Sequence, residues 1–241
     1  GGLIRVEHRM GSWQLLGGLS RTARVADATE RYLGANSPMT PMRWIGNPGL
    51  APAVSHQIDL GAGWRRGTSA VNFTLFGADV SDYILRDRAH GQEGILQNDN
   101  APIYRNVDAR RYGIESDMAF RLTDPLLLTG SLAWVWAENT TDDRPIGQTP
   151  PLHGNVGLAW ARTRWSAGGV VRFAAEQTRV DDNKMTGSGL DVGQTPGWAV
   201  LDLNGGFEIG AGFRVQAGVA NVFDRTYANH INRANAFDPT Q

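Results

Sequence analysis

The chain has 241 residues, no cysteine and a formal net charge of −1 at pH 7. A nearly neutral chain has no overall attraction to nucleic acid, so we expect no nucleic-acid partner. No stretch approaches the roughly 20 apolar residues that a transmembrane helix needs, which excludes helical spanning, and the first residues do not resemble a signal peptide. Every basic residue except Lys184 is an arginine.

Period-two alternation of apolar and polar residues begins early and predicts an all-β fold. Residues 46–64 start as a loop rich in glycine and proline and end as an alternating strand. Ile58 and Leu60 fall on one face of this strand, and Gln57 and Asp59 fall on the other. The alternation alone does not say which face is buried.

The same alternation continues to the end of the chain. In residues 71–85 it changes phase near Leu75 and Phe76, which predicts a β-bulge. Asp27 and Glu30 fit the N-cap and third position of a short helix, although an irregular loop fits equally well. We count ten strands in all. The later alternating segments are 111–122, 126–139, 155–162, 165–173, 200–209 and 213–219.

The connections between the strands fall into two classes. Short turns are expected at 10–12, 65–68, 123–125, 161–164 and 209–212, and long polar segments at 24–54, 87–103, 140–152 and 176–197. These two classes alternate along the chain, as in outer-membrane barrels, whereas a soluble β-sandwich scatters them over both ends. Several strands are long enough to cross a bilayer when tilted. The pattern predicts an antiparallel transmembrane β-barrel segment of about ten strands in the bacterial outer membrane.

Aromatic residues support a membrane location. Trp64, Trp160 and Trp165 lie beside the short turns, where a barrel has an aromatic girdle. The alternative is that they are core tryptophans of a sandwich. In a barrel the apolar faces contact outer-membrane lipid and the opposite faces line a polar lumen. The charged residues expected on the lumen face are Asp59, Arg111, Glu115, Asp117, Arg121, Arg172, Asp202, Glu208 and Arg214.

Strand direction predicts that the barrel has further strands. The long segment after residue 23 marks the second strand as rising toward the outside, so the first strand descends and the tenth rises. Bacterial barrels have an even number of strands and close on themselves, which removes their sheet edges. We therefore expect residues 1–241 to be part of a larger barrel.

Three segments resemble the barrel motifs of TonB-dependent outer-membrane receptors. The run Gly-Asn-Pro-x-Leu-x-Pro before a strand and the run Asn-Val-Phe-Asp-x-x-Tyr near the end are typical of that family. Ala51 and Ala53 stand where the family usually has charged residues. The three segments are residues 21–32, 42–61 and 221–239.

Further residues are similar to the copper-receptor branch of the family. Trp44 precedes Gly46, and a polar group follows Tyr227. This group consists of His230, Asn232, Arg233 and Asn235.

The resemblance implies a partial TonB-dependent receptor barrel, in which residues 1–241 form the C-terminal part of 22 strands without the plug domain and the final strand. For the intact protein it implies copper uptake driven by the TonB complex, which the plug contacts. Uptake of a siderophore or another metal chelate is the alternative. No resident cofactor is expected, since copper would be the transported ligand.

Copper is bound by soft and borderline ligands such as thioether sulfur and imidazole nitrogen. Met39 and Met42 are three residues apart in a predicted external segment, and His230 lies in another. We expect these three residues to be the metal-ligand candidates. The competing interpretation of the methionines is ordinary usage, since the chain has 5 of them.

Other ligand-type side chains have weaker patterns. Met185 and His90 lie in further external segments. His56 and His153 lie near strand ends at the external rim, where we expect hydrogen-bonded structural histidines.

An enzyme is not expected, because no motif orders a nucleophile or a phosphate-binding loop. The enzyme alternative is a ten-stranded outer-membrane protease that uses Asp82, Asp87 and His90, and it requires a closed chain. A segment of a passive porin is the remaining alternative.

Overall fold

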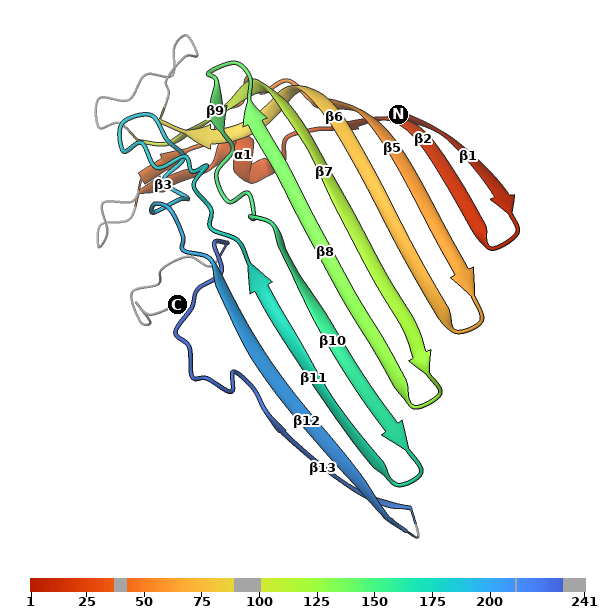
Figure 1. The fold of residues 1–241 in the computed structure, drawn as a ribbon. Helices are drawn as coiled ribbons and strands as arrows, with labels where there is room; N and C mark the ends of the chain where they lie inside the picture. The colour runs from red at the N-terminus through yellow and green to blue at the C-terminus, as the bar shows by residue number, and fades with distance from the viewer. Residues whose placement is uncertain (37–42, 89–100, 211, 232–241) are drawn as a thin grey trace.

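The computed structural model describes residues 1–36, 43–88, 101–210 and 212–231. Ten strands pair in sequence order as one curved antiparallel sheet (Figure 1), which confirms the predicted strand number. In the described chain the sheet is open, with β1 and β13 at its two edges. The strands are β1 (Gly2–Met10), β2 (Trp13–Arg24), β5 (Ala53–Arg66), β6 (Ser69–Asp87), β7 (Ile103–Thr123), β8 (Leu126–Asn139), β10 (His153–Arg162), β11 (Trp165–Ala174), β12 (Trp198–Gly210) and β13 (Phe213–Val219).

Short elements occupy the long connections. They are α1 (Ala28–Tyr32), β3 (Gly34–Asn36), β4 (Arg43–Ile45) and β9 (Arg144–Pro145). Of the two interpretations left open by the sequence, the short helix is the one observed, since Asp27 caps α1 and exchanges hydrogen bonds with Glu30 in a capping box. No helix in the described residues is long and apolar enough to cross a membrane.

The two ends of the sheet differ as expected. The short turns lie at one end, here called the short-turn end, and the described parts of the long segments lie at the other, the long-segment end (Figure 1). The connection lengths predicted from the sequence are therefore confirmed.

Strand register assigns the side chains to two faces. Directly paired residues on neighbouring strands share a face, so Leu19, Ile58 and Tyr112 belong to one face, here called the apolar face. Gln57 and Asp59 belong to the opposite, polar face. The exposed large hydrophobic residues of the ten strands are mostly on the apolar face, which is what a lipid-facing wall requires.

The sheet forms a single layer. Trp165 on the apolar face is 59% exposed, which contradicts the sandwich alternative, because a sandwich would bury such a side chain between two sheets. The main buried apolar cluster of the described chain is small and lies near the long-segment end, where α1 adjoins the wall. It consists of Ala26, Leu50, Ala53, Val80, Ile84 and Ala109.

The bulge in β6 lies later than predicted. The strand pairs without interruption through Leu75 and Phe76, and the register shifts between Val80 and Tyr83 instead. Phe76 mimics a change of phase because it is an aromatic residue on the polar face. There it covers Gly113, whose added Cβ would lie 2.6 Å from the Phe76 ring. An aromatic side chain over a strand glycine is a recognised packing device.

Candidate functional site

A cavity of about 270 Å³ lies on the polar face near the long-segment end. Its wall comes from β8, β10, β11 and β12, and its rim includes residues that follow β13. Register places His153 beside Ala174 and Asn155 beside Arg172, so these strands direct their polar-face side chains toward one space. The lining residues are Ser131, Pro150, Pro151, His153, Gly154, Asn155, Arg172, Phe173, Ala174, Trp198, Asn229, His230 and Ile231.

Two histidines line this cavity. His153 is exposed, and its Nδ1 lies 2.9 Å from the Pro151 carbonyl oxygen. When Nδ1 donates to that carbonyl, Nε2 keeps a free lone pair that can bind a metal ion. The His230 side chain is only 3% exposed. Its Nδ1 lies 2.8 Å from Thr195 Oγ1, and its Nε2 lies 3.4 Å from an oxygen of Asp191.

The buried Nε2 of His230 has no hydrogen-bond partner among the described residues. A buried polar atom without such a partner is uncommon in a folded protein. The ring borders the cavity, and the carboxylate of Asp191 is the nearest charged neighbour of this nitrogen.

An ion pair fixes the neighbouring wall. Arg172 Nε donates to Asp202 Oδ2 at 2.7 Å, and a second guanidinium nitrogen donates to the Tyr227 hydroxyl at 3.4 Å. The Tyr227 ring packs against Trp198, with 4.3 Å between the ring centroids. Arg172 and Asp202, both expected on the lumen face, thus pair across neighbouring strands.

The run Asn-Val-Phe-Asp-x-x-Tyr has a structural explanation. The backbone N–H of Asn221 donates to Asp202 at 2.8 Å. The Asn221 side chain accepts from the Arg225 backbone N–H and donates to the Arg225 carbonyl oxygen. This turn directs the chain after β13 onto the polar face, which brings His230 to the cavity.

A buried ion network joins the long segments. Arg105 donates to both carboxylate oxygens of Asp87, at 2.9 and 2.8 Å. Arg144 donates to Asp87 at 2.7 Å and to Asp181 at 3.4 Å. Asp142 accepts from Arg105 and Arg144. The network connects β6, β7 and β9 with the segment between β11 and β12, and it commits Asp87 to structural ion pairs rather than to the alternative protease site.

Electrostatics favour the ionised form of Asp142. Burial raises the pKa of its carboxyl group, but hydrogen bonds from Arg105 and Asn139 outweigh burial, and nearby positive charge adds to them. The pKa of Asp142 therefore lies below its ordinary value.

The predicted ligand residues have different outcomes. Met39, Met42 and His90 lie outside the described residues. Met185 is 68% exposed in the segment between β11 and β12. The described residues contain no group of three or more His, Cys, Asp or Glu side chains that could hold a metal ion. His230 lines the cavity.

Sequence reasoning missed the place of His153 in the cavity. The alternation of side chains along β10 was the available signal, because it places His153 and Asn155 together on the polar face. Nothing local predicted that His230, far along the chain, would meet the same cavity.

Residues 11–222 match the model of a protein family described as TonB dependent receptor-like, beta-barrel. A solved structure described as the copper transporter OprC is 28% identical with a TM-score of 0.80, and the match covers 96% of this chain and 35% of that one. No protein of curated function matches significantly in sequence.

Solved siderophore receptors share the fold at lower identity. The siderophore receptor PirA from Pseudomonas aeruginosa is 16% identical with a TM-score of 0.66, covering 92% of this chain and 38% of that one. A variant of the ferric enterobactin receptor PfeA from Pseudomonas aeruginosa, in complex with enterobactin, is 20% identical with a TM-score of 0.71, covering 94% and 36%. The chain thus spans between 35% and 38% of the length of these structures.

Proposed function

Because the chain belongs to the family of TonB-dependent receptor-like β-barrels, we propose that it acts in the outer membrane in the TonB-coupled uptake of a metal ion or metal chelate. Copper is the proposed cargo, and the TonB complex is the proposed source of energy. The apolar face contacts lipid, and the polar face lines the path of the cargo. The relatives named above are transport receptors, which favours transport over the protease alternative.

The observation that carries the proposal is the cavity that brings together His153 and His230 on the polar face. Imidazole nitrogen suits copper as a ligand, and both rings border the cavity. The exposed His153 offers its Nε2 atom, and the His230 ring lies between Thr195 and Asp191. The likeness to a copper transporter at 28% identity supports copper as the cargo. In this proposal the two histidines contact copper during its passage.

Met39 and Met42 complete the proposed copper path. The sequence pattern predicts an external location for their segment, and thioether sulfur binds Cu(I) well. We assign them to first capture and His230 to the next contact.

A metal chelate is the second candidate cargo. Trp198 lines the cavity and offers an aromatic surface to an organic ligand shell. The cavity is close in size to the lower end of small-molecule sites, which hold roughly 300 Å³.

Copper accumulation by cells that depend on this protein tests the proposal. We expect uptake to require TonB and to need about tenfold more copper for half-saturation in His153→Ala or His230→Ala, because each change removes one nitrogen donor. His8→Ala is the matched control, since His8 lies on the apolar face of β1.

Two results would contradict the copper proposal. One is copper uptake that is unchanged in both cavity variants. The other is TonB-dependent uptake of a ferric siderophore in cells whose copper content is unaffected by the protein, which would favour the chelate.

A further inference from the structure

Charged side chains occupy the apolar face near the long-segment end. In the strand register Arg21 lies opposite His56, His56 opposite Asp79, and Asp79 opposite Arg110. These four residues form one row across four strands, here called the rim row. Alternation along each strand places them on the same face as Ile58. Charged residues are expensive against hydrocarbon, so the rim row marks the level where the apolar wall meets a polar layer.

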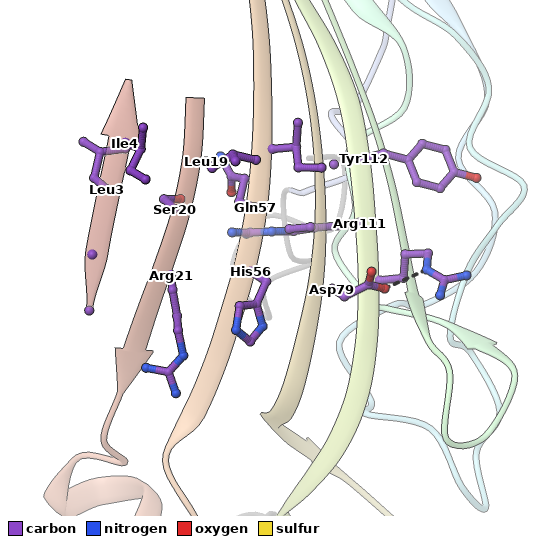
Figure 2. A pocket seen from close by; sticks show the side chains of 16 residues that line it. Leu3, Ile4, Leu19, Ser20, Arg21, His56, Gln57, Asp79, Arg111 and Tyr112 are labelled. Carbon is purple, nitrogen blue, oxygen red and sulfur yellow. Dashed lines mark hydrogen bonds and ion pairs between the residues drawn. The ribbon is translucent and has the colours of Figure 1, made fainter. Parts of the chain in front are cut away.

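A hollow of about 970 Å³ adjoins the rim row (Figure 2). Its lining also includes Ser20, Gln57 and Arg111, which the register places on the polar face. The next row toward the short-turn end is apolar and contains Ile4, Leu19, Ile58 and Tyr112. Gly77 belongs to this row, and a Cβ added there would meet nothing within 4 Å. The missing side chain leaves space in the apolar row between Ile58 and Tyr112.

Within the rim row, Asp79 and Arg110 bond to each other, whereas Arg21 and His56 do not. Arg110 Nε donates to Asp79 at 2.8 Å, and this pair neutralises itself. The side chains of Arg21 and His56 have no hydrogen bond or ion pair to any residue that the structure describes. Figure 2 shows them on adjacent strands, apart from the bonded pair. A guanidinium in this position needs an anion or water.

We propose that the rim row and its hollow bind one phosphorylated lipid of the outer leaflet. The phosphate accepts hydrogen bonds from Arg21 and from the His56 ring, and an acyl chain covers Leu19 and Ile58. Phosphate suits Arg21, because guanidinium groups bind its oxygens through two parallel hydrogen bonds. The acyl chain suits Leu19 and Ile58, each 54% exposed. This inference rests on the membrane location in the proposed function.

Lipid binding by the protein extracted from outer membranes in mild detergent tests the inference. The probes are phosphatidic acid and diacylglycerol with the same acyl chains, which differ only in the phosphate, and native mass spectrometry counts the bound lipid. We expect the protein to bind phosphatidic acid at least tenfold more tightly than diacylglycerol. Inorganic phosphate at the same concentration should not displace the lipid, because the acyl chain contributes to binding.

Variants locate the site. Arg21→Gln with His56→Gln should remove the preference for phosphatidic acid, whereas Arg21→Lys should retain part of it. The control is Arg66→Gln, an exposed arginine on the apolar face at the short-turn end, which should bind as the unaltered protein does. Equal heat-modified migration on gels would show that all variants fold.

Equal binding of the two lipids, or undiminished phosphatidic acid binding by the double variant, would overturn the inference. Copper uptake is measured separately on the same variants. A protein that inserts and binds lipid but transports no metal contradicts only the proposed cargo. A protein absent from the outer membrane contradicts the proposed function itself.

Discussion

Asp142 illustrates how single residues hold the long segments together. It accepts hydrogen bonds from Arg105 and Asn139 and lies close to Arg144. Both arginines also bind the fully buried Asp87. Removing one member of a buried ion group leaves the others uncompensated, so these residues act as a unit.

The lowered pKa of Asp142 predicts acid sensitivity of the long-segment end. An acid whose pKa is lower in the folded state stabilises that state at pH values above its unfolded pKa, near 4. This contribution is lost as the pH falls from there through the lower folded pKa. We expect faster proteolysis of the long segments as the pH falls below about 4, measured with an acid-active protease on membrane-embedded protein.

Asp142→Asn is the control for this effect, because it removes the titrating group and keeps the shape. Its proteolysis at neutral pH should exceed that of the unaltered protein, and its further increase in acid should be smaller. An identical acid response in both proteins would contradict the assignment to Asp142.

At the scale of elements, the Gly-Asn-Pro run joins α1 to the wall. Asn47 is 2% exposed, and its side chain donates to the Tyr104 carbonyl oxygen at 3.1 Å. Arg31 of α1 donates to the carbonyl oxygens of Pro48 and Leu50. Gly46 donates to the Leu33 carbonyl oxygen at 2.7 Å. The motif is thus explained as a packing device for α1.

Gly46→Ala should loosen α1. The added Cβ would lie 2.6 Å from the Arg31 carbonyl carbon and 2.7 Å from the Tyr32 nitrogen, both backbone atoms. Overpacking of this kind costs about 1 to 3 kcal/mol, so we expect hydrogen exchange of the α1 amides to accelerate by about tenfold. Mass spectrometry of exchanged peptides measures this.

Gly34→Ala is the matched control for α1, because a Cβ at Gly34 would meet nothing within 4 Å. Exchange in this variant should equal that of the unaltered protein. Unchanged exchange in Gly46→Ala would refute the packing explanation.

The elements differ in how far the sequence predicts them. The strands and their faces follow from alternation, which is a local pattern. The bulge of β6 depends on Asp82, which adopts φ 57°, and no local pattern marks that conformation. The bulge was predicted at the wrong place because Phe76 packs over Gly113, which is on another strand.

At the scale of the whole molecule, the apolar face predicts direct lipid contact. Trp165 lies on this face at the short-turn end, whereas Trp198 lies on the polar face. In variants that keep a single tryptophan, brominated lipids should quench the fluorescence of Trp165 strongly and that of Trp198 weakly, since quenching requires contact. Equal quenching of the two would contradict the orientation of the wall.

The cavity was less predictable than the wall. His153 and Arg172 are placed by neighbouring strands, so parity predicts that they share a face. His230 follows a turn in which Asn221 and Asp224 both adopt φ 49°. Contacts that depend on such a turn are not encoded in any periodic pattern. His230, the one predicted ligand residue that the structure places in the cavity, was predicted by resemblance.

The near absence of lysine gives the molecule an unusual chemical asymmetry. Lys184 is exposed in the segment between β11 and β12, and it carries the chain's single side-chain primary amine. Amine-directed labels therefore attach to the side chains of this sequence at one point on the long-segment end. A dye or spin label can be placed there without engineering, while the cavity and the wall keep their native side chains.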